Sequence, residues 1–315
     1  MLPVAVNEFT STTQLNGWQL FLSLAKGHWM PGSAWQNPAY RRKFVLRSLA
    51  TPLTTTHLLN ELSHHPMLEK LLTAQPGLPC RAHRPYLTAN FTRKDAVNAL
   101  SFHYHAISHK LPERLLQQHY SAHGARLATI TGKDENFYHL DLCALANLDK
   151  EGEATITLTR QDGVVLTELT FTLCEYQGKF TLLIGGLQGA KNDIPHEYIQ
   201  LATKACHGLF PKRLALEAAC QLARHLGVSQ ILAVSNSAHI YRSWRYWKKK
   251  KDKMHADYDS FWASMGGELL PDGLFALPMG VARKPIEEIA SKKRAEYRRR
   301  YGLLDDMTTQ IAHQL

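Results

Sequence analysis

The segment Gly208–Tyr241, GLFPKRLALEAACQLARHLGVSQILAVSNSAHIY, predicts a loop, an amphipathic helix and a buried strand in succession. Ile231–Val234 is continuously apolar, as expected of a strand that is covered on both faces. Gly227 stands where a helix commonly ends in a left-handed residue. Because polar residues follow the strand, we expect a ligand site beside its carboxyl end. Within the helix, apolar side chains recur at three- and four-residue spacing and share one face: Leu214, Ala218, Ala219, Leu222 and Leu226.

The first turn of this helix has features of an anion site. Pro211 suits the first helical position, since its missing N–H would be unpaired there in any case. Lys212 and Arg213 place positive charge at the positive end of the helix dipole, which costs about 0.3–1 kcal/mol each unless an anion neutralises them. The alternative is that both side chains extend into water, where screening makes that cost small.

The order of helix, strand, Asn236 and Tyr241 resembles the acetyl-coenzyme A segment of GNAT-type acyltransferases. In that family a glycine-rich turn cradles the pyrophosphate on its backbone amides, and a tyrosine protonates the leaving thiolate. The resemblance implies acyl-coenzyme A as a cofactor, held by Gly208, Lys212, Arg213 and Asn236, with Tyr241 as the general acid. Asn236 would contact the pantetheine arm, or else cap the helix that follows.

The general base is left open by the sequence. Glu168, inside a predicted hairpin strand, and Glu175 just beyond it are the nearest acidic side chains. His239 is a third candidate, because its reference pKa lies close to neutrality. Each of these residue types is more often found in an ordinary surface role, so the pattern does not select among them.

Nine short motifs spread over the chain resemble the VirK/YbjX family of bacterial proteins, whose reaction is unknown. That resemblance implies a role in envelope integrity, virulence or tolerance of antimicrobial peptides, without implying a particular reaction. The motifs are Asn37-Pro-Ala-Tyr-Arg-Arg-Lys-Phe44, Arg84-Pro-Tyr-Leu87, His119-Tyr120, Leu169-Thr-Phe-Thr172, Ile184-Gly-Gly-Leu-Gln-Gly189, His207-Gly-Leu-Phe-Pro-Lys212, Ala233-Val-Ser-Asn236, Tyr258-x-x-Phe-Trp262 and Lys292-Lys-Arg-Ala-Glu-Tyr-Arg-Arg-Arg-Tyr301.

The composition is that of a folded protein, with 44% hydrophobic and 20% charged residues in a chain of 315. No run approaches the ~20 apolar residues that cross a bilayer, and the first residues lack the basic and apolar segments of a secretory signal. Five scattered cysteines without a CxxC pair indicate reduced thiols. We therefore expect a cytoplasmic protein, able to lie peripherally at the inner face of the membrane.

The net charge of +10 is uneven, because the 19 Lys and Arg and 11 Asp and Glu from residue 201 onward supply +8 of it. Trp244, Tyr246 and Trp247 interleave with Arg242, Arg245 and the run Lys248–Lys251. Such clusters bind nucleic acid or anionic lipid surfaces. Since no helix-turn-helix, zinc-finger or RNA-recognition pattern accompanies them, we expect no sequence-specific nucleic-acid partner.

The simpler interpretation of the same region is one helix whose aromatic stripe faces the core, with the lysines on its wet face. That stripe comprises Tyr241, Trp244, Trp247, Met254, Tyr258, Phe261 and Met265. A metal site is also not expected. Of His103, His105 and His109, only the last two would share a helix face, and no HExxH or Cys/His knuckle is present.

The order of elements indicates an α+β fold. Residues 1–122 are predicted to form a mostly helical N-terminal region, and residues 123–315 a GNAT-like domain with a mixed, mostly antiparallel sheet and basic C-terminal helices. Asp162-Gly163 predicts a hairpin. The predicted helices are Asn37–Leu49, Thr54–Thr73 with a break at His64–Pro66, and Thr92–Tyr120 interrupted at Pro112. The predicted strands are Arg126–Thr131, Phe137–Leu142, Ala154–Thr159, Val164–Leu173, Phe180–Gly186, Ile231–Val234, Glu268–Leu270 and Leu274–Leu277.

Two functions of different class remain open. The first is transfer of an acyl group from coenzyme A to an amine, with Tyr241 as acid. The second is a non-catalytic adaptor that docks its basic helices on an anionic membrane surface or partner.

Overall fold

The sheet has eight strands in the order β1-β2-β3-β4-β5-β6-β8-β7, within the residues that the computed structural model describes, 15–247 and 257–315. Neighbouring strands are antiparallel except β5 and β6, which are parallel. The predicted α+β fold with a mixed, mostly antiparallel sheet is therefore confirmed. The strands are β1 (Ala125–Thr131), β2 (Phe137–Cys143), β3 (Ala154–Arg160), β4 (Val165–Tyr176), β5 (Lys179–Gly189), β6 (Gln230–Val234), β7 (Glu268–Leu269) and β8 (Leu274–Leu277).

The hairpin between β3 and β4 turns at the predicted place. Gly163 has φ +86°, and the Arg160 amide donates to the Val164 carbonyl at 2.9 Å. β4 and β5 both extend further than predicted. Their ends carry polar residues such as Glu175 and Gln188, which the hydrophobic pattern assigned to loops although the backbone pairing continues through them.

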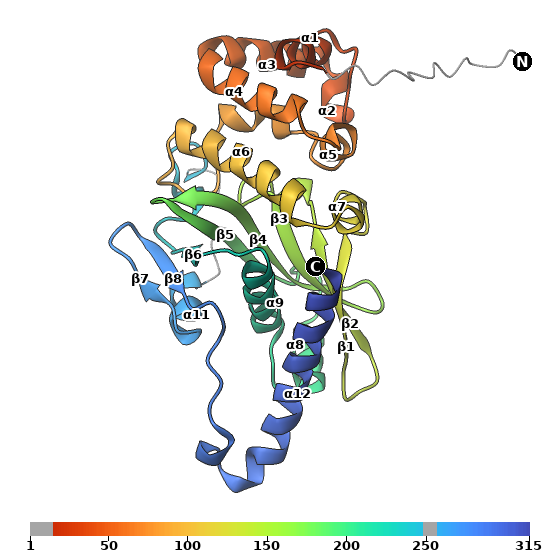
Figure 1. Ribbon diagram of the computed structural model, residues 1–315, viewed down its shortest axis with the longest axis vertical. Coiled ribbons are helices and arrows are strands. Elements are labelled where there is room, and N and C mark those ends of the chain that lie inside the picture. Colours follow the sequence, from red (N-terminus) through yellow and green to blue (C-terminus); the bar gives the residue numbers. More distant parts are fainter. Residues whose placement is uncertain (1–14, 248–256) are drawn as a thin grey trace, which may run out of the picture.

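Helices stack at one end of the molecule and form the N-terminal region (Figure 1). The predicted breaks at His64–Pro66 and at Pro112 are confirmed, because one helix ends and another begins around each. The first helix was not predicted; its N-terminus is closed by a capping box between Asn16 and Gln19. The elements are α1 (Gly17–Lys26), α2 (Ser33–Gln36), α3 (Pro38–Ala50), α4 (Pro52–Ser63), α5 (Leu68–Ala74), η1 (Leu78–His83), α6 (Arg93–Lys110) and α7 (Glu113–His119).

The remaining helices follow the meander of strands. α9 begins at Pro211 as predicted, buries the predicted apolar face, and is followed by Gly227 at φ +71°. Its neighbour α8 was not predicted. The elements are η2 (Ala146–Leu148), α8 (His196–Ala205), α9 (Pro211–His225), η3 (Ile240–Arg242), α11 (Tyr258–Ser264), η5 (Ile286–Glu288) and α12 (Ser291–Gln314).

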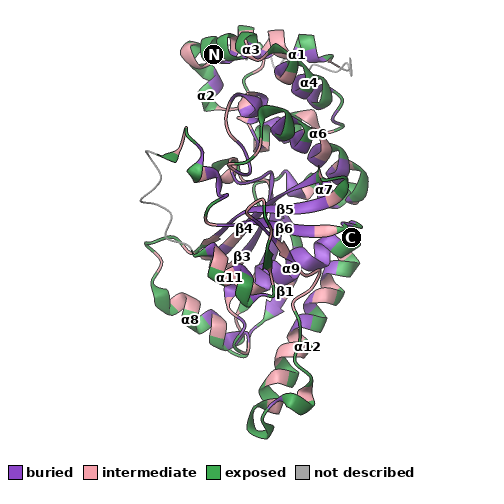
Figure 2. Cartoon of the chain, turned by 90° about the vertical axis from the view of Figure 1, so that its left-hand side faces the viewer, coloured by how far each residue is buried: buried purple, intermediate pink, exposed green. Residues whose placement is uncertain are grey.

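Helices cover both faces of the sheet. α6 lies above the strands and packs on β4, whereas α9 lies below and packs on β3, β4 and β5 (Figure 1). The strands between them are almost wholly buried (Figure 2). One apolar core runs from Leu20 in α1 to Ile311 in α12 and so includes residues on both sides of position 122. The division into regions 1–122 and 123–315 stays a prediction.

The two parallel strands separate part-way along their length. Their pairing runs from Thr181 opposite Gln230 to Ile184 opposite Ala233, and β5 then continues to Gly189 without β6. A bulge at Gly185 marks the point of separation, because Phe171 of β4 pairs with Ile184 while Thr170 pairs with Gly186. We call the space beyond this point the split.

The single aromatic helix expected between Tyr241 and Met265 is wrong in its first part. Residues 240–242 form a short 3₁₀ helix. Trp244, which follows it, is 79% exposed and therefore does not face the core. Tyr258 and Met265 are buried as expected, whereas Met254 and Lys248–Lys251 lie outside the described residues. Every helix in the described ranges is too short or too polar to cross a membrane.

Candidate functional site

A buried carboxyl group stands at the split. Glu151 belongs to the turn between η2 and β3 and is 1% exposed. Its Oε2 accepts a hydrogen bond from Nε2 of Gln188 at 3.0 Å, and the carboxyl also hydrogen-bonds the Tyr241 side chain. Burial raises the pKa of Glu151, while the bonds from Gln188 and Tyr241 oppose that rise. A buried carboxyl whose pKa is raised can take up a proton during a reaction and release it again.

Two glycines of β5 make room for this carboxyl. A Cβ at Gly185 would overlap the Glu151 carbonyl oxygen, and a Cβ at Gly186 would overlap Oε2 of the same residue. Glycine in a strand interior often marks such a close approach. The motif Ile184–Gly189 therefore positions Glu151 against the bulged strand.

His239 lies beside Glu151 and is neutral. Its Nδ1 accepts from the Tyr241 amide at 3.3 Å, which places the ring proton on Nε2. Nε2 is 3.9 Å from Oε1 of Glu151. Burial, aided by the charge of Arg242, lowers the pKa of His239 to about 4, so the pair is not an ion pair at neutral pH. The ring stacks on Tyr258, with centroids 5.2 Å apart.

Glu168 lies next to this group on β4. It pairs across the strands with Gln188, whose side chain contacts Glu151. Burial raises the pKa of Glu168, and the charge of Lys191 opposes the rise. Of the four side chains that the sequence suggested for acid–base chemistry, Tyr241, His239 and Glu168 lie around the Glu151 carboxyl, which the sequence did not suggest. Glu175 lies at the other end of β4, opposite Phe180.

The residues proposed for the cofactor lie in two places. A Cβ at Gly208 (φ +81°) would meet the Arg300 side chain, and the amides of Gly208 and Leu209 donate to the carbonyls of Thr203 and Cys206 at the end of α8. Those two amides are therefore occupied. A Cβ at Gly189 would lie 3.8 Å from Cε of Lys212, which puts this lysine at the end of β5.

The two basic residues of the first turn of α9 differ. Arg213 contacts Glu217 one turn later at 3.4 Å. Lys212 has no ion pair within the described part of the chain, and burial lowers its pKa. Of the two, Lys212 is the cation that an anion at this helix terminus would neutralise.

Asn236 holds the start of α11. Its Oδ1 accepts from the Tyr258 amide at 3.0 Å, and its Nδ2 donates to Asp257 at 3.3 Å. Its own amide donates to Asp259 at 2.7 Å. These bonds place α11 across the end of β6.

Side chains of α11 fill the split. The Leu187 amide of β5 donates to the Tyr258 hydroxyl at 3.3 Å, and the Trp262 indole donates to the Val234 carbonyl at 3.0 Å. Each of these aromatic side chains thereby forms a hydrogen bond with a backbone group that has no strand partner after the strands separate.

Sequence reasoning missed Glu151 because Lys150-Glu151-Gly152-Glu153 has the composition of an exposed turn. The available signal was Gly185-Gly186 inside an otherwise apolar strand, which indicates that something approaches the backbone there. It does not indicate what approaches, since the partner comes from a distant turn.

A second buried carboxyl in the same turn is structural. Glu153 pairs with Arg81 of η1 and accepts from the Tyr104 hydroxyl, and Arg81 also donates to the Asp149 carbonyl at 2.8 Å. Burial alone would lower the pKa of Arg81, but the Glu153 carboxylate raises it, so the guanidinium stays charged. This group fastens the helical region to the sheet.

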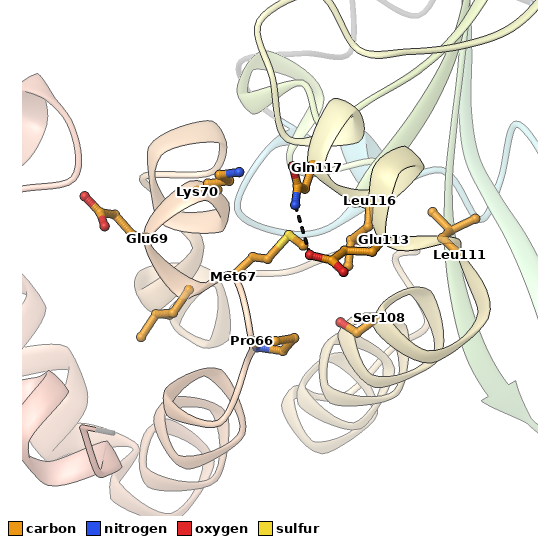
Figure 3. Close-up of a pocket in the computed structure, with 10 residues that line it drawn as sticks. Pro66, Met67, Glu69, Lys70, Ser108, Leu111, Glu113, Leu116 and Gln117 are labelled. Atoms are coloured by element: carbon orange, nitrogen blue, oxygen red, sulfur yellow. Dashed lines mark hydrogen bonds between the residues drawn. The ribbon is translucent and has the colours of Figure 1, made fainter. Parts of the chain in front are cut away.

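A pocket of about 680 Å³ between α5, α6 and α7 has no group of side chains suited to catalysis among the residues described (Figure 3). Three of its polar side chains are engaged within the protein, as Gln117 donates to Glu113 at 3.0 Å and Ser108 donates to the Tyr104 carbonyl at 2.6 Å. In the described parts of the chain, no three His, Cys, Asp or Glu side chains are placed to hold a metal ion.

Comparison with known proteins identifies relatives but no reaction. Residues 33–313 match the model of a protein family of unknown function, DUF535. An uncharacterised protein of Escherichia coli K12, YbjX, is 52% identical over 304 residues, which cover 96% of this chain and 92% of that protein. The chain belongs to the VirK/YbjX (DUF535) family.

Two other relatives are more distant in sequence. Two uncharacterised proteins of Haemophilus influenzae are 31% and 32% identical to this VirK/YbjX family member, over 51% and 47% of its length and 52% and 48% of theirs. No solved structure matches the chain. The family resemblance is thus confirmed, and the function has to be argued from the site.

Proposed function

We propose that this protein transfers an acyl group from coenzyme A to an amine, with the reaction at the split between β5 and β6. The observation that carries the proposal is the Glu151 carboxyl, buried against the bulge of β5 and hydrogen-bonded to Tyr241. A pair of parallel strands that separate, with a helix N-terminus at their carboxyl end, is where an open sheet offers a ligand site.

The reaction needs one proton to move from the amine to the sulfur. The amine nitrogen attacks the thioester carbonyl carbon, and Glu151 takes the proton that the nitrogen loses as the N–C bond forms. The C–S bond then breaks, and Tyr241 donates its proton to the thiolate. Burial and the neighbouring Glu151 charge raise the pKa of Tyr241, which keeps its hydroxyl protonated beforehand. The proton on Glu151 restores Tyr241 through the bond between them.

Lys212 and the N-terminus of α9 are suited to hold the diphosphate. Its ammonium lacks an ion pair among the described residues, and it stands at the end of β5. An anion there would gain from both the charge and the helix dipole. Gly208, Arg213 and Asn236 would act indirectly, because their polar groups already bind protein atoms.

An acyl chain that enters the split has to displace Tyr258 and Trp262. Both side chains hydrogen-bond backbone groups that the ligand would then take over. Ligand binding is therefore expected to be coupled to a shift of α11.

The test is a thermal-shift titration with acetyl-coenzyme A and longer acyl-coenzyme A. Saturation at one hundred times Kd should add about 2.7 kcal/mol of stability. Lys212→Gln should weaken binding about tenfold or more, as for loss of one charged contact to phosphate, whereas Lys204→Gln at the exposed end of α8 should not. No stabilisation by any acyl-coenzyme A would refute the proposal.

A second candidate is the adaptor, supported by the exposed aromatic and basic residues after η3. Trp244 is 79% exposed and lies between Arg242 and Arg245. Such a patch suits the inner face of a membrane, where a cytoplasmic protein would support envelope integrity, virulence or antimicrobial-peptide tolerance. Co-sedimentation with phosphatidylglycerol vesicles should be lost in Trp244→Ala and kept in Trp18→Ala, which removes another exposed tryptophan, in α1. Equal binding by both variants would remove this candidate.

A further inference from the structure

A basic pocket lies where the helical region meets the segment after η3. It has a volume of about 330 Å³ and is lined by nine residues between His83 and Ala96 on one side and by residues 242–245 on the other. The first side is the end of η1 and the N-terminus of α6. These two parts of the chain are far apart in sequence, so the pocket exists only in the folded protein. Its volume is at the lower end of the range of small-molecule sites.

Four arginines line this pocket: Arg84, Arg93, Arg242 and Arg245. None of its described lining residues is acidic. Arg84 is neutralised by Asp149, and Arg242 donates to the Asn236 carbonyl at 3.2 Å. For Arg93 and Arg245, no hydrogen bond or ion pair is found among the residues described. Arg93 is also the first residue of α6, so its charge adds to the positive end of that helix dipole.

Three buried polar atoms of the lining residues lack a hydrogen-bond partner within the described chain. They are Nδ1 of His83, Nε of Arg84 and Oγ of Ser243. The His83 and Ser243 residues are only 6% and 7% exposed. His83 is held in place through its other ring nitrogen, which lies 3.1 Å from Oγ1 of Thr55. Buried polar atoms are rarely left unpaired in folded proteins.

We propose that this pocket binds the phosphate group of a small molecule. A phosphate carries the charge to pair with Arg93 and Arg245, and enough acceptor oxygens to bind the Arg84 Nε–H and the Ser243 hydroxyl as well. His83 contributes as a neutral donor, because burial and the charges of Arg47, Arg93 and Arg245 lower its pKa to about 4. The Ser243 hydroxyl and the His83 ring would make the site selective for a phosphate group, which surface charge alone would not do.

This site is separate from the one proposed for acyl transfer. The acyl-transfer proposal places phosphates at Lys212 and the N-terminus of α9, below the sheet, whereas the basic pocket adjoins the N-terminus of α6 above it (Figure 1). Either site can be occupied without the other, and the two respond to different substitutions.

The experiment measures pyrophosphate and inorganic phosphate binding by calorimetry, at constant ionic strength and neutral pH, with the full chain. We expect saturable binding, weakened about tenfold or more by Arg93→Gln and by Arg245→Gln, and several-fold by Ser243→Ala. Arg298→Gln removes the same charge from the exposed face of α12 and should leave the Kd unchanged. Lys212→Gln removes any pyrophosphate binding at the N-terminus of α9, and the saturable binding that remains reports on the basic pocket. Unfolding temperatures without ligand show whether each variant is folded.

A second arm distinguishes a free phosphate compound from a lipid headgroup. Vesicles of phosphatidylcholine, with and without phosphatidylglycerol, are offered to the same variants. Saturable binding of soluble pyrophosphate would show that the pocket binds a free phosphate compound. Binding only to phosphatidylglycerol vesicles, with loss in Arg245→Gln but not in Arg298→Gln, assigns it to a headgroup. The inference is overturned if neither probe binds, if Arg298→Gln weakens binding as much as Arg245→Gln, or if Lys212→Gln abolishes it.

Discussion

At Gly186, β5 has no room for a side chain, because the Glu151 carboxyl occupies the place of a Cβ. Gly186→Ala should therefore destabilise the protein by about 1–3 kcal/mol, as overpacking does. Gly302→Ala in α12 is the control, since a Cβ there meets nothing within 4 Å and alanine favours a helix by about 1 kcal/mol. Urea unfolding measures both. If Gly186→Ala unfolds at the same urea concentration as the unsubstituted protein, Glu151 does not pack as described.

The raised pKa of Glu151 gives the stability a pH dependence whose sign is opposite to that of a salt-bridged carboxylate. The folded state holds the proton more tightly than the unfolded state, so stability falls as the pH rises from the unfolded pKa of about 4.3 toward the folded pKa. Glu151→Gln removes this contribution. We expect the variant to gain stability relative to the parent protein as the pH rises to neutral. A stability difference that is constant from acid to neutral pH would contradict the assignment.

In the proposed reaction, one proton passes between Tyr241 and Glu151. Substitution of either residue should therefore reduce turnover without weakening the binding of acyl-coenzyme A. Tyr241→Phe and Glu151→Gln are each expected to lower kcat by about 10²–10⁴-fold, the usual contribution of a general acid or base. The binding of acyl-coenzyme A should stay within a few-fold. An adaptor would lose no function in Tyr241→Phe.

Among the elements, α11 depends on Asn236 for its position. Asn236→Ala removes the acceptor for the Tyr258 amide and should cost about 1 kcal/mol, as for loss of a helix cap. Asn236→Asp keeps the acceptor oxygen but sets a second carboxylate against Asp257, so it should cost at least as much. Hydrogen exchange of the amides of α11 measures the effect. Unchanged exchange in Asn236→Ala would show that other contacts hold the helix.

The elements also show what sequence patterns could predict. The buried face of α9 and the run Ile231–Val234 follow from local periodicity, and both were predicted correctly. The separation of β5 from β6 could not be predicted, because it depends on a bulge that only the neighbouring strand reveals. Trp244 was assigned to the core since its spacing matched a helix, but η3 ends at Arg242 and the chain leaves helical geometry before the tryptophan.

In the whole molecule, the buried ion pair of Arg81 and Glu153 joins the helical region to the sheet. Glu153→Gln leaves the buried Arg81 charge with only its longer contact to the Asp149 carboxylate, at 3.7 Å, and should destabilise the protein by about 3–5 kcal/mol. Replacing both residues, as in Arg81→Met with Glu153→Leu, should cost less than the sum of the two single changes. Chemical unfolding of the parent protein, the two single variants and the double variant gives the coupling free energy between the two residues. Additive effects would mean that the pair does not act as a unit.

Across the whole molecule, the candidate site draws residues from the turn before β3, from β4 and β5, and from the segment after β6. Tyr241, His239 and Glu168 follow recognisable elements, so the sequence could propose them as site residues, and the fold places them near one another. Glu151 could not be identified, because only the tertiary fold brings its turn to the bulge.

The measurement that tests the central claim most directly is the NMR signal of the Trp262 indole N–H during titration with acyl-coenzyme A. This group donates to the Val234 carbonyl inside the split, and each of the six tryptophans can be assigned by substitution. An acyl-coenzyme A that enters the split must shift the Trp262 signal saturably, with the Kd seen by thermal shift. Ligand binding that leaves this signal unchanged, or no binding at all, would contradict acyl transfer at the split.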